Sequence, residues 1–182
     1  FAAETVLELM RSGSTIEQAY QNTLLPALLS IQLKARQGSL SAAQEHSAGD
    51  ISRYIMYRVL DNIFNEQQLP FKILAACMPG EQDLLGSELF ANYLEMQGWS
   101  LLFMRDARTV DEVVQAAVPY EPHIALLSAA SIQSLPPALE RAAAINQACP
   151  QARIAFEGRA ALLARDQLAC HGDAVVSGFE KG

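Results

Sequence analysis

The sequence predicts an α/β protein in which a small helical bundle is followed by a doubly wound parallel sheet. Two observations predict this fold class. Up to residue 66, apolar side chains recur at helical spacing, whereas from residue 71 onward five short apolar runs alternate with four helical patterns. Residues 65–70 form a short polar linker that ends in proline. The expected domains are therefore a helical bundle over 1–66 and an α/β domain over 71–182.

The first domain is expected to hold three helices, as in a small bundle. The first ends at Ser12-Gly13, and Ser14 or Thr15 can cap the second. Pro26 predicts a kink in the second helix, and the third begins near Ser41. The apolar positions of the three helices are Val6, Leu7, Leu9 and Met10, then Leu24, Leu25, Leu28, Leu29, Ile31 and Leu33, and then Ile51, Tyr54, Ile55, Tyr57, Val59, Leu60 and Ile63.

The second domain alternates strands with helices throughout. Such alternation predicts parallel strands joined by right-handed crossovers, in the flavodoxin-like order 2-1-3-4-5. The expected strands are 72–77, 100–104, 124–128, 153–156 and 174–176, and the expected helices are 82–97, 109–118, 135–148 and 160–169.

Composition and charge narrow the classes of function. An apolar fraction of 51% is enough for a buried core. The net charge is −7, and the 13 basic residues are scattered, so this chain is not expected to contact nucleic acid directly. No apolar run is long enough to span a membrane, and the first residues carry no basic signal-peptide region.

Cysteine usage points to a reducing compartment. The three cysteines, Cys77, Cys149 and Cys170, are far apart and form no C-x-x-C pair or disulfide framework. We therefore expect a cytoplasmic protein. Because the chain starts at Phe1 rather than Met and stops soon after a predicted strand, we also expect it to be a fragment of a longer one.

Polar residues follow four of the predicted strands. In an open parallel sheet, ligands bind at the carboxyl ends of the strands. This edge would bring together residues 80–86, Arg105-Asp106, Ser128 with Ser131, and Glu157-Gly158. The first of these loops has neither the G-x-G-x-x-G of dinucleotide folds nor the G-K-[ST] of a P-loop, which disfavours a phosphate cradle.

Asp83 lies inside that loop and is open to several interpretations. It can be a helix N-cap, a metal ligand or a phosphoacceptor. A phosphoacceptor would need acidic partners and a later lysine, and no such set is visible. The sequence also contains no plausible catalytic triad, no paired catalytic carboxylates and no zinc spacing, so we expect no enzymatic activity.

Two segments resemble a known family. The first is residues 38–46, which end in Glu45-His46, and the second is residues 79–86, followed by residues 88–90 and 94–99. Together they resemble the cobalamin-binding sensory module of light-responsive MerR-type transcriptional regulators, the CarH and LitR class. Related modules occur in methionine synthase and in corrinoid methyl-carrier proteins. The resemblance implies a helical cap followed by a Rossmann-like cobalamin-binding domain.

The cap motif matches only in part. Glu45 and His46 match the family's Glu-His pair, which faces the upper side of the corrin, and Ala42 lies in the same motif. The family's cap tryptophan corresponds to Ala35, and a neighbouring histidine corresponds to Arg36. This resemblance implies a cap without the aromatic lid over an adenosyl group.

The lower side departs from the family as well. The family loop E/D-x-H-x-x-G is Glu81-x-Asp83-x-x-Gly86 here, so an aspartate replaces the histidine that binds cobalt. The two glycines that let a nucleotide tail pass correspond to Glu157 and Gly158. Ser128 and Ser131 match hydroxyl positions that line the tail in relatives. His123 and His171 precede strands and are expected at the opposite edge of the sheet.

The resemblance implies a regulatory domain with an altered corrinoid site. We expect a homo-oligomer that reaches DNA through a domain outside this chain and is controlled by a separate photoreceptor protein, with or without cobalamin. The alternatives are a corrinoid carrier of a methyltransferase system and a heme or bilin sensor, for which Cys77 is the nearest ligand. The cap residues Leu28, Ile31 and Leu40 either serve oligomer contacts or belong to the bundle core.

Overall fold

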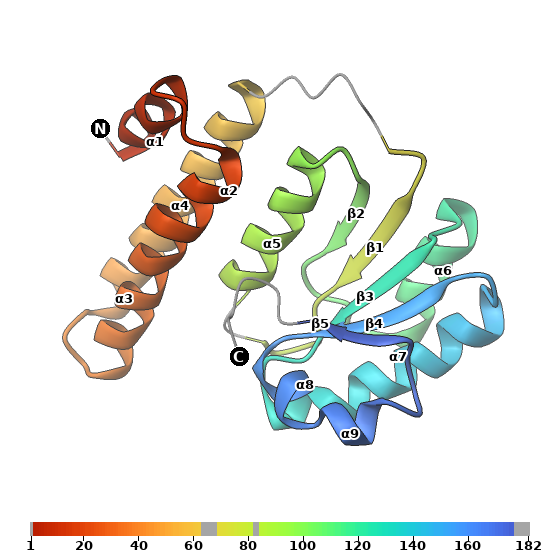
Figure 1. Cartoon of the computed structure of the whole chain (residues 1–182). Coiled ribbons are helices and arrows are strands. Elements are labelled where there is room, and N and C mark those ends of the chain that lie inside the picture. Colours follow the sequence, from red (N-terminus) through yellow and green to blue (C-terminus); the bar gives the residue numbers. More distant parts are fainter. Residues whose placement is uncertain (1, 63–68, 82–83, 177–182) are drawn as a thin grey trace. The chain divides into compact units, whose positions relative to one another are not determined.

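A computed structural model describes residues 2–62, 69–81 and 84–176 of the 182-residue chain. The chain forms two compact units, Phe1–Asn65 and Glu66–Gly182 (Figure 1). The first is helical and the second contains the sheet.

The helical unit is built around one long helix. It comprises α1 (Ala2–Arg11), α2 (Ile16–Ala19), a π-helical turn (Tyr20–Leu24), α3 (Leu25–Arg36) and α4 (Ala42–Asn62). Helices α1 and α3 both pack on α4. The buried apolar side chains of this unit include Val6, Leu7, Leu24, Ile55 and Met56, which accounts for the helical spacing in the sequence.

Two reciprocal caps explain where helices begin. The Gln18 backbone N–H donates to Thr15 Oγ1 (3.1 Å) while the Thr15 N–H donates to Gln18 Oε1 (3.0 Å). Ser41 and Gln44 form the same arrangement at the start of α4, at 3.3 and 2.9 Å. Each pair satisfies amide groups that a first helical turn leaves without partners.

The kink expected at Pro26 stays a prediction. Pro26 is the second residue of α3, and the π-helical turn Tyr20–Leu24 runs directly into this helix.

The sheet has five parallel strands in the order β2-β1-β3-β4-β5, as predicted. The strands are β1 (Lys72–Ala76), β2 (Ser100–Met104), β3 (Ile124–Ser128), β4 (Arg153–Glu157) and β5 (Ala174–Val176). Two bounds differ from the prediction: β1 ends before Cys77, and β4 continues to Glu157, which pairs with Ser128 and Val176.

The helices that join the strands are α5 (Leu85–Met96), α6 (Val110–Tyr120), α7 (Leu135–Ala148), α8 (Arg159–Leu163) and α9 (Arg165–Leu168), with a 3₁₀ turn over Ile132–Ser134. A Thr109–Glu112 capping box starts α6. The predicted helix 160–169 is two short helices, because the chain leaves helical geometry at Ala164. The predicted helix 82–97 begins later, at Leu85, and residues 82–83 lie outside the described ranges.

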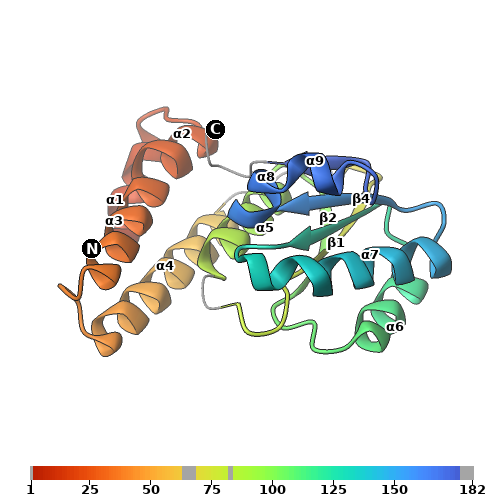
Figure 2. The ribbon, with the colours of Figure 1, turned by 90° about the horizontal axis from the view of Figure 1, so that it is seen from below.

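The sheet is covered on both faces. On one face α6, α7, α8 and α9 enclose the larger core, which includes Leu74, Leu127 and Phe156 (Figure 2). On the other face, Ile73, Ala75 and Leu126 pack with Phe90 and Leu94 of α5. Burial on two faces explains why the strands read as continuous apolar runs rather than as alternating patterns.

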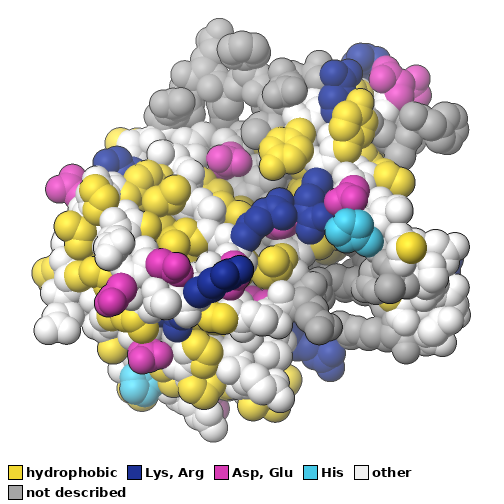
Figure 3. Space-filling view, turned by 180° about the vertical axis from the view of Figure 1, so that it is seen from behind, with side chains coloured by type: hydrophobic (Ala, Val, Ile, Leu, Met, Phe, Trp, Pro, Cys, Tyr) yellow, Lys and Arg dark blue, Asp and Glu magenta, His cyan; other side chains and the backbone are white. Residues whose placement is uncertain are grey.

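One face of the molecule can be inspected for patches of charge. Basic, acidic and hydrophobic side chains are interspersed on the face shown in Figure 3. None of the helices in the described part of the chain is long and apolar enough to cross a membrane.

Candidate functional site

The carboxyl ends of the five parallel strands lie at one edge of the sheet. Strand β1 leads to β2 on one side and β2 leads back to β3 on the other, so the connections diverge between β1 and β3. Such a switch point is where open α/β sheets hold their ligands. Glu81 lies in the loop after β1, and Ser128 is the last residue of β3.

Glu81 connects these two loops. Its Oε2 accepts a hydrogen bond from Ser128 Oγ (3.0 Å), and its Oε1 accepts one from the Ala130 backbone N–H (2.7 Å). Ser87, in the first turn of α5, extends the network because its Oγ lies 3.2 Å from Ser128 Oγ. The two oxygens of the Glu81 carboxylate therefore connect the loop after β1 with the end of β3 and the loop that follows it, across the switch point.

Cys77 lies beneath this network and is 1% exposed. Burial raises the pKa of its thiol, and the negative charges of Glu157, Glu81 and Glu88 raise it further. The thiol therefore stays protonated at neutral pH. Because heme iron takes cysteine as a thiolate, the heme interpretation of Cys77 is disfavoured.

Glu88 is the second acidic side chain of the edge, and only 5% of it is exposed. Its Oε1 lies 3.0 Å from Nη1 of the half-exposed Arg105, which follows β2. The buried Arg141 of α7 holds the next part of that loop, since its guanidinium donates to the carbonyls of Ala107 (2.6 Å) and Arg108 (2.9 Å). The loop after β2 is thus fixed by two charged side chains.

The ends of β3 and β4 are joined directly. The Ala129 N–H donates to the Glu157 carbonyl (2.7 Å), and the Ala160 N–H donates to the Ala129 carbonyl (3.0 Å). Gly158 has φ +100°, and a Cβ there would lie 2.8 Å from the Ala129 oxygen. The close approach of the two backbones explains the glycine at this position.

The sheet brings together several predicted site residues. Glu81, Ser128, Glu157 and Gly158 all lie at the carboxyl edge, and Gly86 lies in the first turn of α5. Ser131 does not join the Glu81 network, because its Oγ pairs with Ser134 Oγ (2.9 Å).

Asp83 lies outside the described residues, so its proposed roles stay predictions. The N-cap position of α5 is Leu84, which makes no side-chain capping bond.

The sequence did not indicate three groups of this edge: Ser87, Glu88 and the Ala130 N–H. Ser87 and Glu88 follow the loop motif by one and two residues, and their polarity was the available signal. The Ala130 donor is a backbone group, so no side-chain pattern could have marked it.

The predicted cap residues belong to the helical unit. Ala35 is half-buried in the last turn of α3, while the side chains of Arg36, Ala42 and Glu45 are outside the described set. His46 is exposed on α4, with its Nε2 3.4 Å from Asp50 Oδ2. Of the expected apolar contact residues, Ile31 and Leu40 are half-buried, and the Leu28 side chain is not described.

The other two histidines lie at the amino ends of the strands, as expected. His123 Nδ1 accepts a hydrogen bond from the Lys72 N–H at the start of β1 (3.1 Å), and its ring meets Phe71 edge-on. His171 precedes β5. The described residues contain no group of three His, Cys, Asp or Glu side chains that could hold a metal ion.

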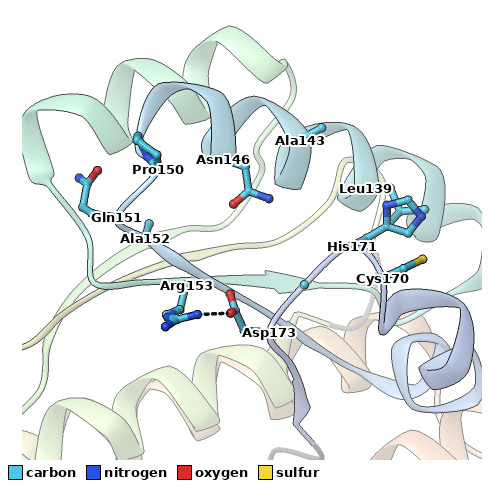
Figure 4. Close-up of a pocket in the computed structure, with 11 residues that line it drawn as sticks. Leu139, Ala143, Asn146, Pro150, Gln151, Ala152, Arg153, Cys170, His171 and Asp173 are labelled. Carbon is cyan, nitrogen blue, oxygen red and sulfur yellow. Dashed lines mark hydrogen bonds and ion pairs between the residues drawn. The ribbon is translucent and has the colours of Figure 1, made fainter.

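A cavity of about 670 Å³ lies at the amino end of β4 (Figure 4). The side chains around it include Asn146 of α7 and the pair Arg153–Asp173 (2.7 Å). A hydrogen bond from the Ile154 N–H lowers the pKa of Asp173, and Arg153 lowers it further. Because this cavity is at the edge opposite Glu81, it is separate from the predicted site.

Comparison with solved structures finds this fold in corrinoid proteins. The monomethylamine corrinoid protein of Methanosarcina barkeri superposes with a TM-score of 0.75 at 13% identity, over 97% of this chain and 85% of that one. A cobalamin-binding protein of Desulfitobacterium hafniense DCB-2 gives a TM-score of 0.57 at 16% identity, over 97% and 84%. No family model and no curated relative matches. The chain thus has the helical-plus-α/β fold of corrinoid proteins.

The edge does not fit every way of holding cobalamin. Cobalt in corrinoids takes an imidazole nitrogen as a lower ligand, but His123 and His171 lie at the amino edge and His46 belongs to the helical unit. What the described edge offers is carboxylate and hydroxyl oxygens and a protonated thiol. These groups suit hydrogen bonds to the amide side chains around a corrin better than a bond to cobalt.

Proposed function

We propose that this chain is a corrinoid carrier module of a methyl-transfer system, without an activity of its own. The extent of the structural likeness carries the proposal: both units, and not the sheet alone, fall within the 97% of the chain that superposes on the monomethylamine corrinoid protein. A bound corrinoid would supply a cobalt centre that accepts and releases a methyl group. The protein would hold it at the carboxyl edge.

Exposed apolar side chains support a ligand at this edge. Ile132 follows β3 and is 73% exposed, and Leu163 follows β4 on α8 and is 78% exposed. These are the largest exposed fractions among the large hydrophobic side chains that the structure describes. A corrin ring placed over the edge would cover such side chains, while Ser131 and Arg105 could meet its amide groups.

The proposal is tested by cofactor uptake. Purified protein is incubated with hydroxocobalamin and passed through gel filtration while visible absorbance is recorded. Ile132→Glu should weaken binding by roughly tenfold, because burial of an isoleucine side chain contributes about 1.5 kcal/mol or more. Val118→Glu, at a half-exposed position of α6, is the matched control and should bind like the unmodified protein. Absence of a co-eluting chromophore would contradict the proposal.

A second candidate is a sensory domain of a MerR-type, light-responsive regulator. One observation favours it: Ile51, Tyr54 and Tyr57 of α4 are 54–60% exposed at a spacing of three residues. Such a face suits a protein contact. In this function DNA would be bound by a domain outside this chain, and a separate photoreceptor would provide the signal with or without cobalamin. Failure of corrinoid uptake together with self-association through α4 would favour it.

A further inference from the structure

We propose that Glu81 determines the form in which this edge accepts a corrinoid, by keeping the ligand's nucleotide tail outside the protein. The inference rests on the proposed function and concerns the same site. It follows from three features of the described edge: a carboxylate bridge, a closed strand junction and an unfavourable charge.

The carboxylate bridge crosses the place where a tail would enter. Glu81 reaches from the loop after β1 to the loop after β3, and both of its oxygens are in use, at 3.0 Å from Ser128 Oγ and 2.7 Å from the Ala130 nitrogen. A tail that passes between these loops must break both hydrogen bonds. It must also leave the Ala130 N–H without its partner, or replace that partner.

The neighbouring junction is closed as well. Backbone hydrogen bonds from Ala129 to Glu157, and from Ala160 and Ala161 to Ala129, join the ends of β3 and β4 at 2.7–3.2 Å. The clearance is already small at Gly158, where even a Cβ would meet the Ala129 oxygen at 2.8 Å. A ligand chain therefore has no path there without separating the strands.

The negative charge of the carboxyl edge also opposes entry of the nucleotide tail. The tail of cobalamin carries an anionic phosphodiester, and Glu81, Glu88 and Glu157 all act on the Cys77 thiol at the end of β1. Glu88 has a cationic neighbour, Arg105, whose Nη1 lies 3.0 Å from Glu88 Oε1 and offsets part of this charge. An anion that enters a partly buried site among carboxylates is repelled more strongly than it would be in water.

The test compares two corrinoids that differ in the tail. Cobinamide lacks the nucleotide, whereas cobalamin carries it. We expect the unmodified protein to bind both with dissociation constants within about threefold of each other, and bound cobalamin to keep the visible spectrum of the form in which its own base is on cobalt. Tighter binding of cobalamin by about tenfold or more, or a base-off spectrum, would overturn the inference while leaving the proposed function intact.

Glu81 variants identify the residue responsible. In Glu81→Ala we expect the affinity for cobalamin, relative to the affinity for cobinamide, to rise about fivefold or more, because the carboxylate bridge is removed. Glu81→Gln keeps an acceptor for the Ala130 N–H but removes the charge, so its gain should be smaller. Equal preferences in all three proteins would show that Glu81 has no such role.

A measurement without ligand supports the same test. Hydrogen exchange at the Ala130 amide should be faster in Glu81→Ala than in the unmodified protein, while exchange at the Ala129 amide, which bonds to Glu157, should be unchanged. Equal exchange rates of the Ala130 amide in the two proteins would contradict the hydrogen bond from Ala130 to Glu81. If no variant binds either corrinoid, the proposed function fails, and the inference fails with it.

Discussion

Cys77 and Cys170 have opposite environments although each follows a short element of secondary structure. Cys77 is buried beside three carboxylates that raise the pKa of its thiol, whereas Cys170 is exposed near the end of α9. A raised pKa lowers the thiolate fraction, and the thiolate is the reactive form. The same residue type therefore has different chemistry at the two positions.

This difference predicts selective labelling. In the folded protein at about pH 8, iodoacetamide should modify Cys170, while Cys77 and the buried Cys149 should remain unmodified until denaturant is added. Peptide mass spectrometry reads out each site separately. Modification of Cys77 as fast as Cys170 would contradict the environment described for it.

Glu81 shows how one side chain changes a site. In the resembling family the loop is written with a histidine two residues after the acidic residue, and the match placed Glu81 at the acidic position. The structure shows that this carboxylate contacts Ser128 and Ala130, 47 and 49 residues away. The Glu81 carboxylate therefore spans the switch point, and this does not depend on the role of Asp83.

At the scale of elements, the junction between β4 and α8 depends on glycine. Gly158 combines a positive φ with backbone atoms of Ala129 where a Cβ would be. Gly86, in the first turn of α5, has open space at the same position. These two glycines make a matched pair, because one is required by geometry and the other is not.

The pair predicts opposite effects on stability. Gly158→Ala should lower the free energy of unfolding by about 2 kcal/mol or more, through strain and the displacement of Ala129. Gly86→Ala should leave it unchanged or raise it by about 0.5–1 kcal/mol, because alanine favours a helix. Urea denaturation of both variants measures the difference. Similar losses for both would contradict the close approach at Gly158.

The element bounds were predictable where local chemistry decides them. Thr15, Ser41 and Thr109 each start a helix through a reciprocal cap that the sequence pattern indicates. The break at Ala164 was not predictable, because no proline or glycine marks it. The strand ends shifted by one residue at Cys77 and Glu157, since pairing with neighbouring strands decides where a strand stops.

At the scale of the whole molecule, the exposed face of α4 is the feature that the α/β fold does not explain. We propose that, in the regulatory function, Ile51, Tyr54 and Tyr57 contact a second copy of the chain and so form the homo-oligomer that the resemblance leads us to expect. Tyr54→Lys should then lower the molar mass measured by light scattering at a fixed protein concentration, whereas Val118→Lys should not. A monomeric unmodified protein, or an unchanged mass in Tyr54→Lys, would contradict this contact.

The sequence by itself determined the fold class, the strand order and the edge at which a site should lie. Apolar periodicity specifies helices and buried strands, and strict alternation with right-handed crossovers leaves few orders for the strands. Only the tertiary structure decided which groups meet at that edge. The bond from Glu81 to the Ala130 N–H, the junction of Ala129 with Glu157 and the burial of Cys77 each depend on backbone atoms or charges that are distant in sequence. Residue types alone cannot encode such distances, because the fold of the intervening chain sets them.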